Sequence, residues 1–133
     1  MKPTDIRITD CRTSCTNYDF RMPIKFGGVA VNSAIVLDAE CDVVTRDGRV
    51  AHGFGSMPLA NTWAFPSREM AFHQTQNAMR VLSERCATIC NGFNEFGHPI
   101  ELGLELEALF LTAAVEVSRE LKLTQPIPKL CTL

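Results

Sequence analysis

The sequence of 133 residues has no hydrophobic run long enough to cross a membrane and no marked excess of charge of either sign. A transmembrane helix needs about 18 or more apolar residues in a row, and no segment approaches that length. The net charge of −2 gives no electrostatic attraction to nucleic acid or to anionic lipid. The N-terminal residues MKPTDIRITDCRTS lack the apolar stretch of a secretory signal. We therefore expect a cytoplasmic protein without nucleic-acid or membrane partners.

Hydrophobic residues make up 46% of the chain and charged residues 21%, and both kinds are spread along its whole length. This composition excludes an intrinsically disordered chain. A chain of this size buries roughly two thirds of its unfolded surface, so one core is enough to hold it together. No internal repeat or low-complexity tract divides the sequence. We expect one folded domain over residues 1–124 and a linker over residues 125–133.

Alternation of apolar and polar residues predicts three strands in the first half of the chain. In the clearest strand, residues 35–43, the odd positions are apolar and three of the even ones are acidic. Asp47-Gly48 then marks a tight hairpin turn, and residues 50–54 run back as the next strand. A shorter strand is expected to begin at Ile6, and its alternation fades near Cys15. Together these strands form an antiparallel β-meander.

The second half of the chain is predicted to be helical. Ser67 is expected to cap a helix that ends at Gly92, and Pro99 is expected to begin a second helix. The second helix carries an apolar stripe with its glutamates on the other side, which is typical of an amphipathic helix packed on a sheet. Strands followed by helices give an α+β fold, a meander followed by a helical bundle.

Two stretches interrupt these elements, residues 18–28 and residues 53–66. Both are rich in glycine or proline and are too long for minimal turns, and long loops in a compact domain are often functional. The first contains Arg21 and Lys25, whose guanidinium and ammonium groups could bind a carboxylate. A pair of solvated charges is the simpler interpretation of these two residues.

Six cysteines are present, and none of them belongs to a recognisable metal-binding motif. Cys86 and Cys90 would share one face of a helix and could ligate a metal there. No histidine falls at the interval that a zinc site requires. We therefore interpret the cysteines as small, buried hydrophobic residues in a reducing compartment.

The remaining polar residues form no complete catalytic motif. Gly53-x-Gly55 lacks the third glycine and the lysine of a phosphate-binding loop. His52 could serve a small enzyme as a general base, with Asp47 or Ser56 as its partner, but a histidine near a strand end is more often only hydrogen-bonded.

The acidic residues Asp38, Glu40 and Asp42 share one face of the predicted strand and could form a divalent-metal site. Like charges at alternate strand positions more often mark a solvated face. They repel one another unless an ion or an arginine lies over them. We assign no metal ligand in this chain.

The segments DIRITDCRT, YDFRMPIKFGG and VVTRDGRVAHGFGSMPLANTWAFPS, with the helices behind them, resemble the N-terminal capping domain of the enolase superfamily. The resemblance is to the mandelate racemase and muconate lactonizing enzyme branch and covers essentially the whole chain. In that family the capping domain is a three-stranded antiparallel sheet followed by a helical bundle. It packs over the open end of a modified TIM barrel.

The resemblance also implies a site. Two loops of the family's capping domain, after its first and third strands, close on the substrate, and they correspond to the two interrupting stretches here. The substrate-facing side chains implied by this correspondence are Arg21, Lys25, Phe26, Asn61 and Trp63. The family's reaction abstracts a proton next to a carboxylate, and magnesium stabilises the enolate. The catalytic residues and magnesium ligands lie on the barrel.

A barrel needs roughly 200 residues or more, and the chain ends at IPKLCTL, where a barrel would begin. We therefore expect no catalytic residue and no cofactor in this chain, and no activity of the chain alone. The complete enzymes are racemases, cycloisomerases and dehydratases that act on small carboxylic acids. The expected partner is a barrel domain in the same or a separate chain; a fragment, a truncated frame and half of a split enzyme all fit the sequence.

The alternative is a free-standing, homo-oligomeric interaction module without enzymatic activity. The tail distinguishes the two hypotheses. A complete module would bury Ile127, Leu130 and Leu133, whereas a severed capping domain would leave them loose.

Overall fold

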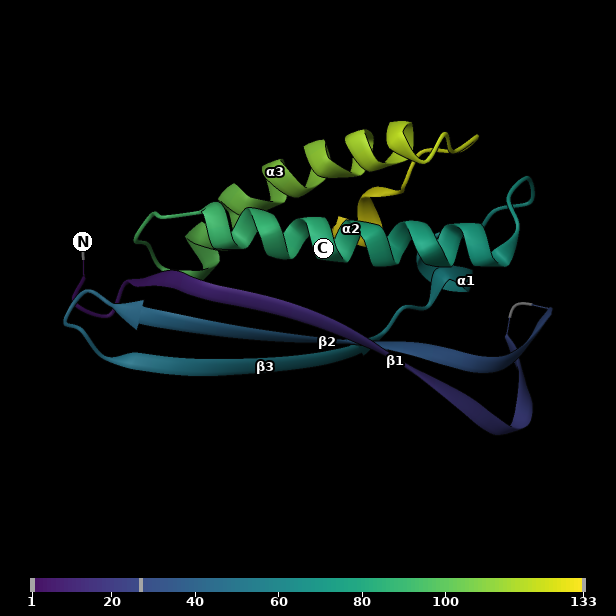
Figure 1. Ribbon diagram of the computed structural model, residues 1–133, viewed down its shortest axis with the longest axis horizontal. Helices are drawn as coiled ribbons and strands as arrows, with labels where there is room; N and C mark the ends of the chain where they lie inside the picture. Colours follow the sequence, from purple (N-terminus) through teal and green to yellow (C-terminus); the bar gives the residue numbers. More distant parts are fainter. Residues whose placement is uncertain (1, 27, 133) are drawn as a thin grey trace.

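The computed structural model describes residues 2–26 and 28–132, without the side chain of Phe26. Its elements are β1 (Ile6–Phe26), β2 (Val29–Thr45), β3 (Val50–Pro58), α1 (Asn61–Ala64), α2 (Phe72–Gly92), α3 (Pro99–Glu120) and the 3₁₀ helix η1 (Lys129–Thr132). The strands form one antiparallel sheet in the order β1-β2-β3. Figure 1 shows α2 and α3 on one face of this sheet, and no described element covers the other face. The predicted α+β meander fold is confirmed.

The first two strands are longer than the sequence predicts. β1 continues to Phe26, so that most of the stretch expected to be a loop is half of a long hairpin; Gly27 lies outside the described residues. The pairing with β2 shifts between Asp19 and Ile24, and Pro23 lies in this irregular part. A bulge can accept a proline because the ladder hydrogen bond is already interrupted there. The prediction of a loop over these residues is therefore wrong.

β3 also extends beyond its predicted end, to Pro58, and takes in the first part of the second expected loop. Every residue of β3 is exposed. β3 is an edge strand, and α2 packs on β1, at the opposite edge of the sheet. In a strand this exposed, glycines such as Gly53 and Gly55 sacrifice few side-chain contacts. The hairpin turn before β3 is as predicted: Gly48 has φ +87° and its N–H donates to the carbonyl of Thr45 at 2.9 Å.

Of the three predicted helix ends, two are correct. α2 ends at Gly92, and α3 begins at Pro99, where the N–H of Ile100 donates to Nδ1 of His98. α2 begins at Phe72, later than predicted, because Ala71 is extended. The hydroxyl oxygen of Ser67 instead accepts the N–H groups of Glu69 and Met70, at 3.2 and 3.0 Å, and caps an isolated turn.

One core lies between the helices, the sheet and the segment that connects β3 to α2. Its buried members are Leu59, Phe65, Met70, Ala78, Met79, Leu82, Ala113, Ala114, Val117 and Ile127. On α3 the apolar stripe buries Leu102, Leu106, Ala113 and Val117, while its member Leu109 is exposed. None of the described helices is both long and apolar enough to cross a membrane.

The C-terminal residues pack against the helices of the same chain. Ile127 is buried in the core, and Lys129 forms an ion pair with Glu107 at 2.7 Å. The thiol of Cys131 donates to the carbonyl of Ala64 at 3.5 Å. Leu130 is about half exposed, and Leu133 lies outside the described residues. The described tail is therefore held in place by contacts within the chain.

Candidate functional site

One end of the molecule brings together the two stretches that the sequence singles out. The hairpin of β1 and β2 reaches past the helices at this end, next to the segment that follows β3 (Figure 1). A mostly apolar depression of about 300 Å³ lies between them. Phe20, Ile24 and Val31 line it from the hairpin, and residues 58–63 line it from the other segment. Side chains far apart in the sequence therefore share one surface.

A second depression of about 720 Å³ adjoins the first and shares with it Asn61, Thr62, Trp63 and Phe72. Both volumes lie within the range of small-ligand sites, which is roughly 300–1,000 Å³. Trp63, the only tryptophan of the chain, borders both depressions and is 67% exposed. Adjoining depressions of this volume, lined largely by apolar side chains, are typical of ligand-binding sites.

Asn61 has a different position from the one its expected role implies. Its side chain is buried, and Nδ2 donates to the carbonyl of Phe72 and to Oγ1 of Thr75, both at 2.9 Å. Both hydrogens of the amide are therefore used within the chain. Asn61 fixes the start of α2 against α1 and so positions Trp63, two residues further along.

Arg21 lies on the irregular part of β1 and Lys25 pairs with Ala30 just beyond it; both are exposed and line neither of the two depressions. Ile24 lines the smaller depression, and Lys25 points to the opposite face because side chains alternate along a strand. The side chain of Phe26 lies outside the described residues. Both cationic residues therefore belong to the hairpin that lines the smaller depression, but neither lines the depression itself.

Sequence reasoning did not identify three of the lining residues, Phe20, Ile24 and Phe72. A signal for the first two was present: apolar residues occupy every second position from Phe20 to Phe26. The proline and glycines in this stretch hid the alternation.

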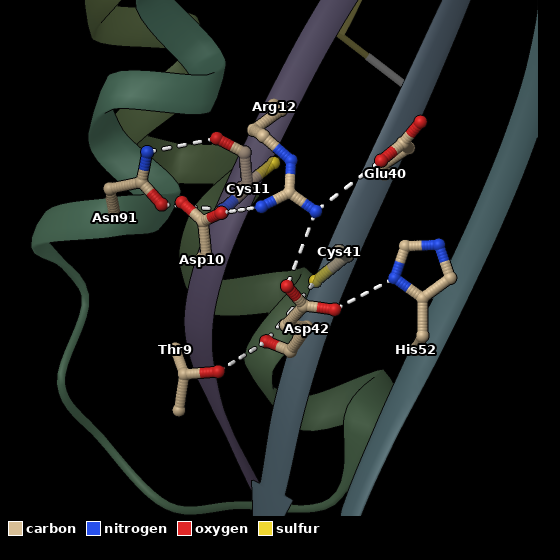
Figure 2. A network of polar contacts seen from close by, with 9 residues as sticks. All are labelled: Thr9, Asp10, Cys11, Arg12, Glu40, Cys41, Asp42, His52 and Asn91. Carbon is tan, nitrogen blue, oxygen red and sulfur yellow. Dashed lines mark hydrogen bonds and ion pairs between the residues drawn. The ribbon is translucent and has the colours of Figure 1, made fainter.

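A second group of polar residues lies on the uncovered face of the sheet, where Figure 2 shows Arg12 among three carboxylates. The guanidinium of Arg12 forms ion pairs with Asp10, with Glu40 at 3.3 Å and with Asp42 at 3.2 Å. Arg12 thus offsets the repulsion expected between the acidic side chains that share this face of β2. Asp38, the remaining acid of the row, accepts a hydrogen bond from the hydroxyl of Ser56 at 2.6 Å. Within the described residues, no group of three ligand-type side chains could hold a metal ion.

His52 belongs to the same network. Its Nδ1 lies 2.7 Å from Oδ1 of Asp42, its register partner across the sheet (Figure 2). The hypothesis of a small enzyme needs His52 beside Asp47 or Ser56. Asp47 instead pairs with Arg49 at 3.1 Å, and Ser56 pairs with Asp38. In the structure the partner of His52 is therefore Asp42, and neither Asp47 nor Ser56 is hydrogen-bonded to it.

Through this network, the ionisation of Asp42 affects the stability of the fold at acidic pH. The hydrogen bond with His52, aided by the charge of Arg12, holds the pKa of Asp42 below its ordinary value. A carboxyl with a depressed pKa stabilises the folded state above the unfolded pKa of about 4, and this contribution is lost as the pH falls through the folded value.

We therefore expect Asp42→Asn to lower the urea midpoint more at pH 7 than at about pH 3, because the stabilising contribution of the ionised carboxyl declines as the pH falls below about 4 toward the depressed pKa of Asp42. Urea titrations of both proteins at the two pH values measure this. A midpoint difference of the same size at both pH values would contradict the assignment.

Comparisons of the chain with models of protein families, with curated proteins and with solved structures found no match.

Proposed function

We propose that the chain is the capping domain of an enolase-superfamily protein of the mandelate racemase and muconate lactonizing enzyme branch. The observation that carries the proposal is the shared surface at one end of the molecule. The two stretches that the resemblance assigns to substrate contact line the same apolar depression there. The three-stranded meander with helices on one face is the architecture that such a domain requires.

The proposed task of the chain is to bind and enclose the substrate, while the reaction itself is catalysed elsewhere. Trp63 and the apolar residues around it would cover a site on a barrel and exclude water from it. Arg21, on the adjoining hairpin, would provide positive charge for a carboxylate, whereas Lys25 points to the opposite face. Magnesium and the acid–base residues would be supplied by the barrel, in the same or a separate chain. The carboxylates of Glu40 and Asp42 are engaged by Arg12, so we assign them no magnesium. We place this function in the cytoplasm.

A chimera tests the proposed substrate contact. In it, residues 1–133 replace the capping domain of a barrel enzyme of this branch. Arg21→Ala in the chimera is expected to lower kcat/KM for a small carboxylic acid by about tenfold or more, because a charge-assisted hydrogen bond contributes about 1.5–3 kcal/mol. Arg49→Ala is the matched control, since Arg49 lies in the hairpin turn before β3 and pairs with Asp47. Equal effects of the two substitutions on kcat/KM would contradict the proposed role of Arg21.

A second candidate function is a free-standing interaction module that forms homo-oligomers. The observation in its favour is the burial of Ile127, because a complete module is expected to bury its tail. Sedimentation equilibrium separates the candidates. A module forms a stable oligomer that persists when a barrel domain is added, whereas a capping domain associates weakly with itself and exchanges that contact for the barrel.

A further inference from the structure

Four of the six cysteines lie together between the sheet and α2. Cys11 of β1 and Cys41 of β2 are register partners on neighbouring strands. Cys86 and Cys90 lie one turn apart on α2, and the thiols of both are close to that of Cys11. All six cysteines are free thiols. A group of thiols drawn from three elements is not explained by the proposed capping function.

Asn91 fixes the end of α2 against Cys11. The backbone N–H of Cys11 donates to Oδ1 of Asn91 at 2.6 Å, and Nδ2 of Asn91 donates to the carbonyl of Cys11 at 2.9 Å (Figure 2). The amide thus takes the place of a neighbouring strand at the outer edge of β1. Because Cys90 directly precedes Asn91, this contact holds Cys90 near Cys11, and the two thiols are close enough for each to influence the pKa of the other.

We propose that Cys11 and Cys90 are a redox-sensitive pair, which a low-molecular-weight disulfide converts into a disulfide bond between β1 and α2. The thiolate of Cys11 attacks one sulfur of the small disulfide, forms a mixed disulfide and releases one small thiolate. Cys90 then loses its proton to solvent and attacks the sulfur of Cys11, which releases the second small thiolate. Two protein thiols are oxidised and one small disulfide is reduced to two thiols.

Burial determines how readily this pair reacts. It raises the pKa of Cys90 to about 12 and also raises the pKa of Cys11. Because the thiolate is the reactive form, the pair stays reduced in a reducing compartment and reacts slowly at neutral pH. The oxidation is therefore run at about pH 8.5, where the thiolate fraction is larger.

The experiment treats the protein with oxidised glutathione and maps the product by tryptic digestion and mass spectrometry. Cys11 lies in the peptide 8–12, and both α2 cysteines lie in the peptide 86–119. We expect these two peptides to be joined in the wild-type protein and in Cys86→Ala, and to be separate in Cys90→Ala. Cys86→Ala is a matched control, because it removes a half-buried thiol one turn away on the same helix.

The thermal unfolding midpoint provides a second readout that needs no variant. A cross-link that closes a long stretch of chain is expected to raise it by about 5 °C or more, and a reductant should reverse the rise. A cross-link from Cys11 to the peptide with Cys41, or its loss in Cys86→Ala, would overturn the assignment. Failure of the wild-type protein to form any internal cross-link would do the same.

Discussion

Phe65→Ala is expected to lower the free energy of unfolding by about 3–5 kcal/mol, the range for truncating a buried phenylalanine. Phe65 is 1% exposed and belongs to the core that joins the connecting segment to the helices. Removing its ring loses the free energy of burying that apolar surface. It also leaves a cavity that the backbone around α1 can fill only in part. Since small domains are stable by only about 5–15 kcal/mol, the variant should be largely unfolded at moderate urea concentrations.

The control for this prediction is Phe54→Ala. Phe54 lies on β3 and is 65% exposed, so that its truncation should cost less than about 1 kcal/mol. Chemical denaturation followed by circular dichroism measures both variants. Similar losses for Phe65 and Phe54 would mean that the connecting segment is not part of the core.

Asn61→Ala is expected to have the second largest effect, a loss of about 1–3 kcal/mol in the free energy of unfolding. The substitution leaves the carbonyl of Phe72 and the hydroxyl of Thr75 without the amide donor at a buried position. It should also change the fluorescence of Trp63, because α1 loses its attachment to α2. Both the urea midpoint and the emission maximum can be read from one titration, since the chain has a single tryptophan.

Asn77→Ala is the matched control, an exposed asparagine on α2 whose side chain accepts a hydrogen bond from Arg80 at 3.0 Å. Its effect should stay within about 0.5 kcal/mol, with the emission of Trp63 unchanged. If Asn61→Ala behaved in the same way, the amide would not be a structural anchor. Its expected role as a substrate contact would then regain support.

Local signals were sufficient to predict the order of the elements and several of their ends. Asp47-Gly48 acts through backbone conformation and Pro99 through its missing N–H, so both can be recognised without knowledge of the fold. The length of β1 could not be predicted in this way, because Pro23 in a bulge looks the same in sequence as Pro23 in a loop.

The candidate site was predicted only in outline. That Asn61 points inward depends on Phe72 and Thr75, which lie on another element. The pairing of Cys11 with Cys90 depends on Asn91, and no spacing in the sequence reveals it. Contacts of this kind arise from tertiary packing. The position of the expected site at one end of the molecule, by contrast, followed from the two unusual stretches.

The central claim is that this chain encloses a substrate while another domain performs the reaction. Proton NMR in deuterated water measures it directly, as exchange of the α-proton in a panel of small carboxylic acids with magnesium present. We predict no exchange with the chain alone, and exchange with the chimera at least about tenfold faster than with the barrel lacking any capping domain. Exchange catalysed by the chain alone, or a folded chimera no faster than the bare barrel, would contradict the claim.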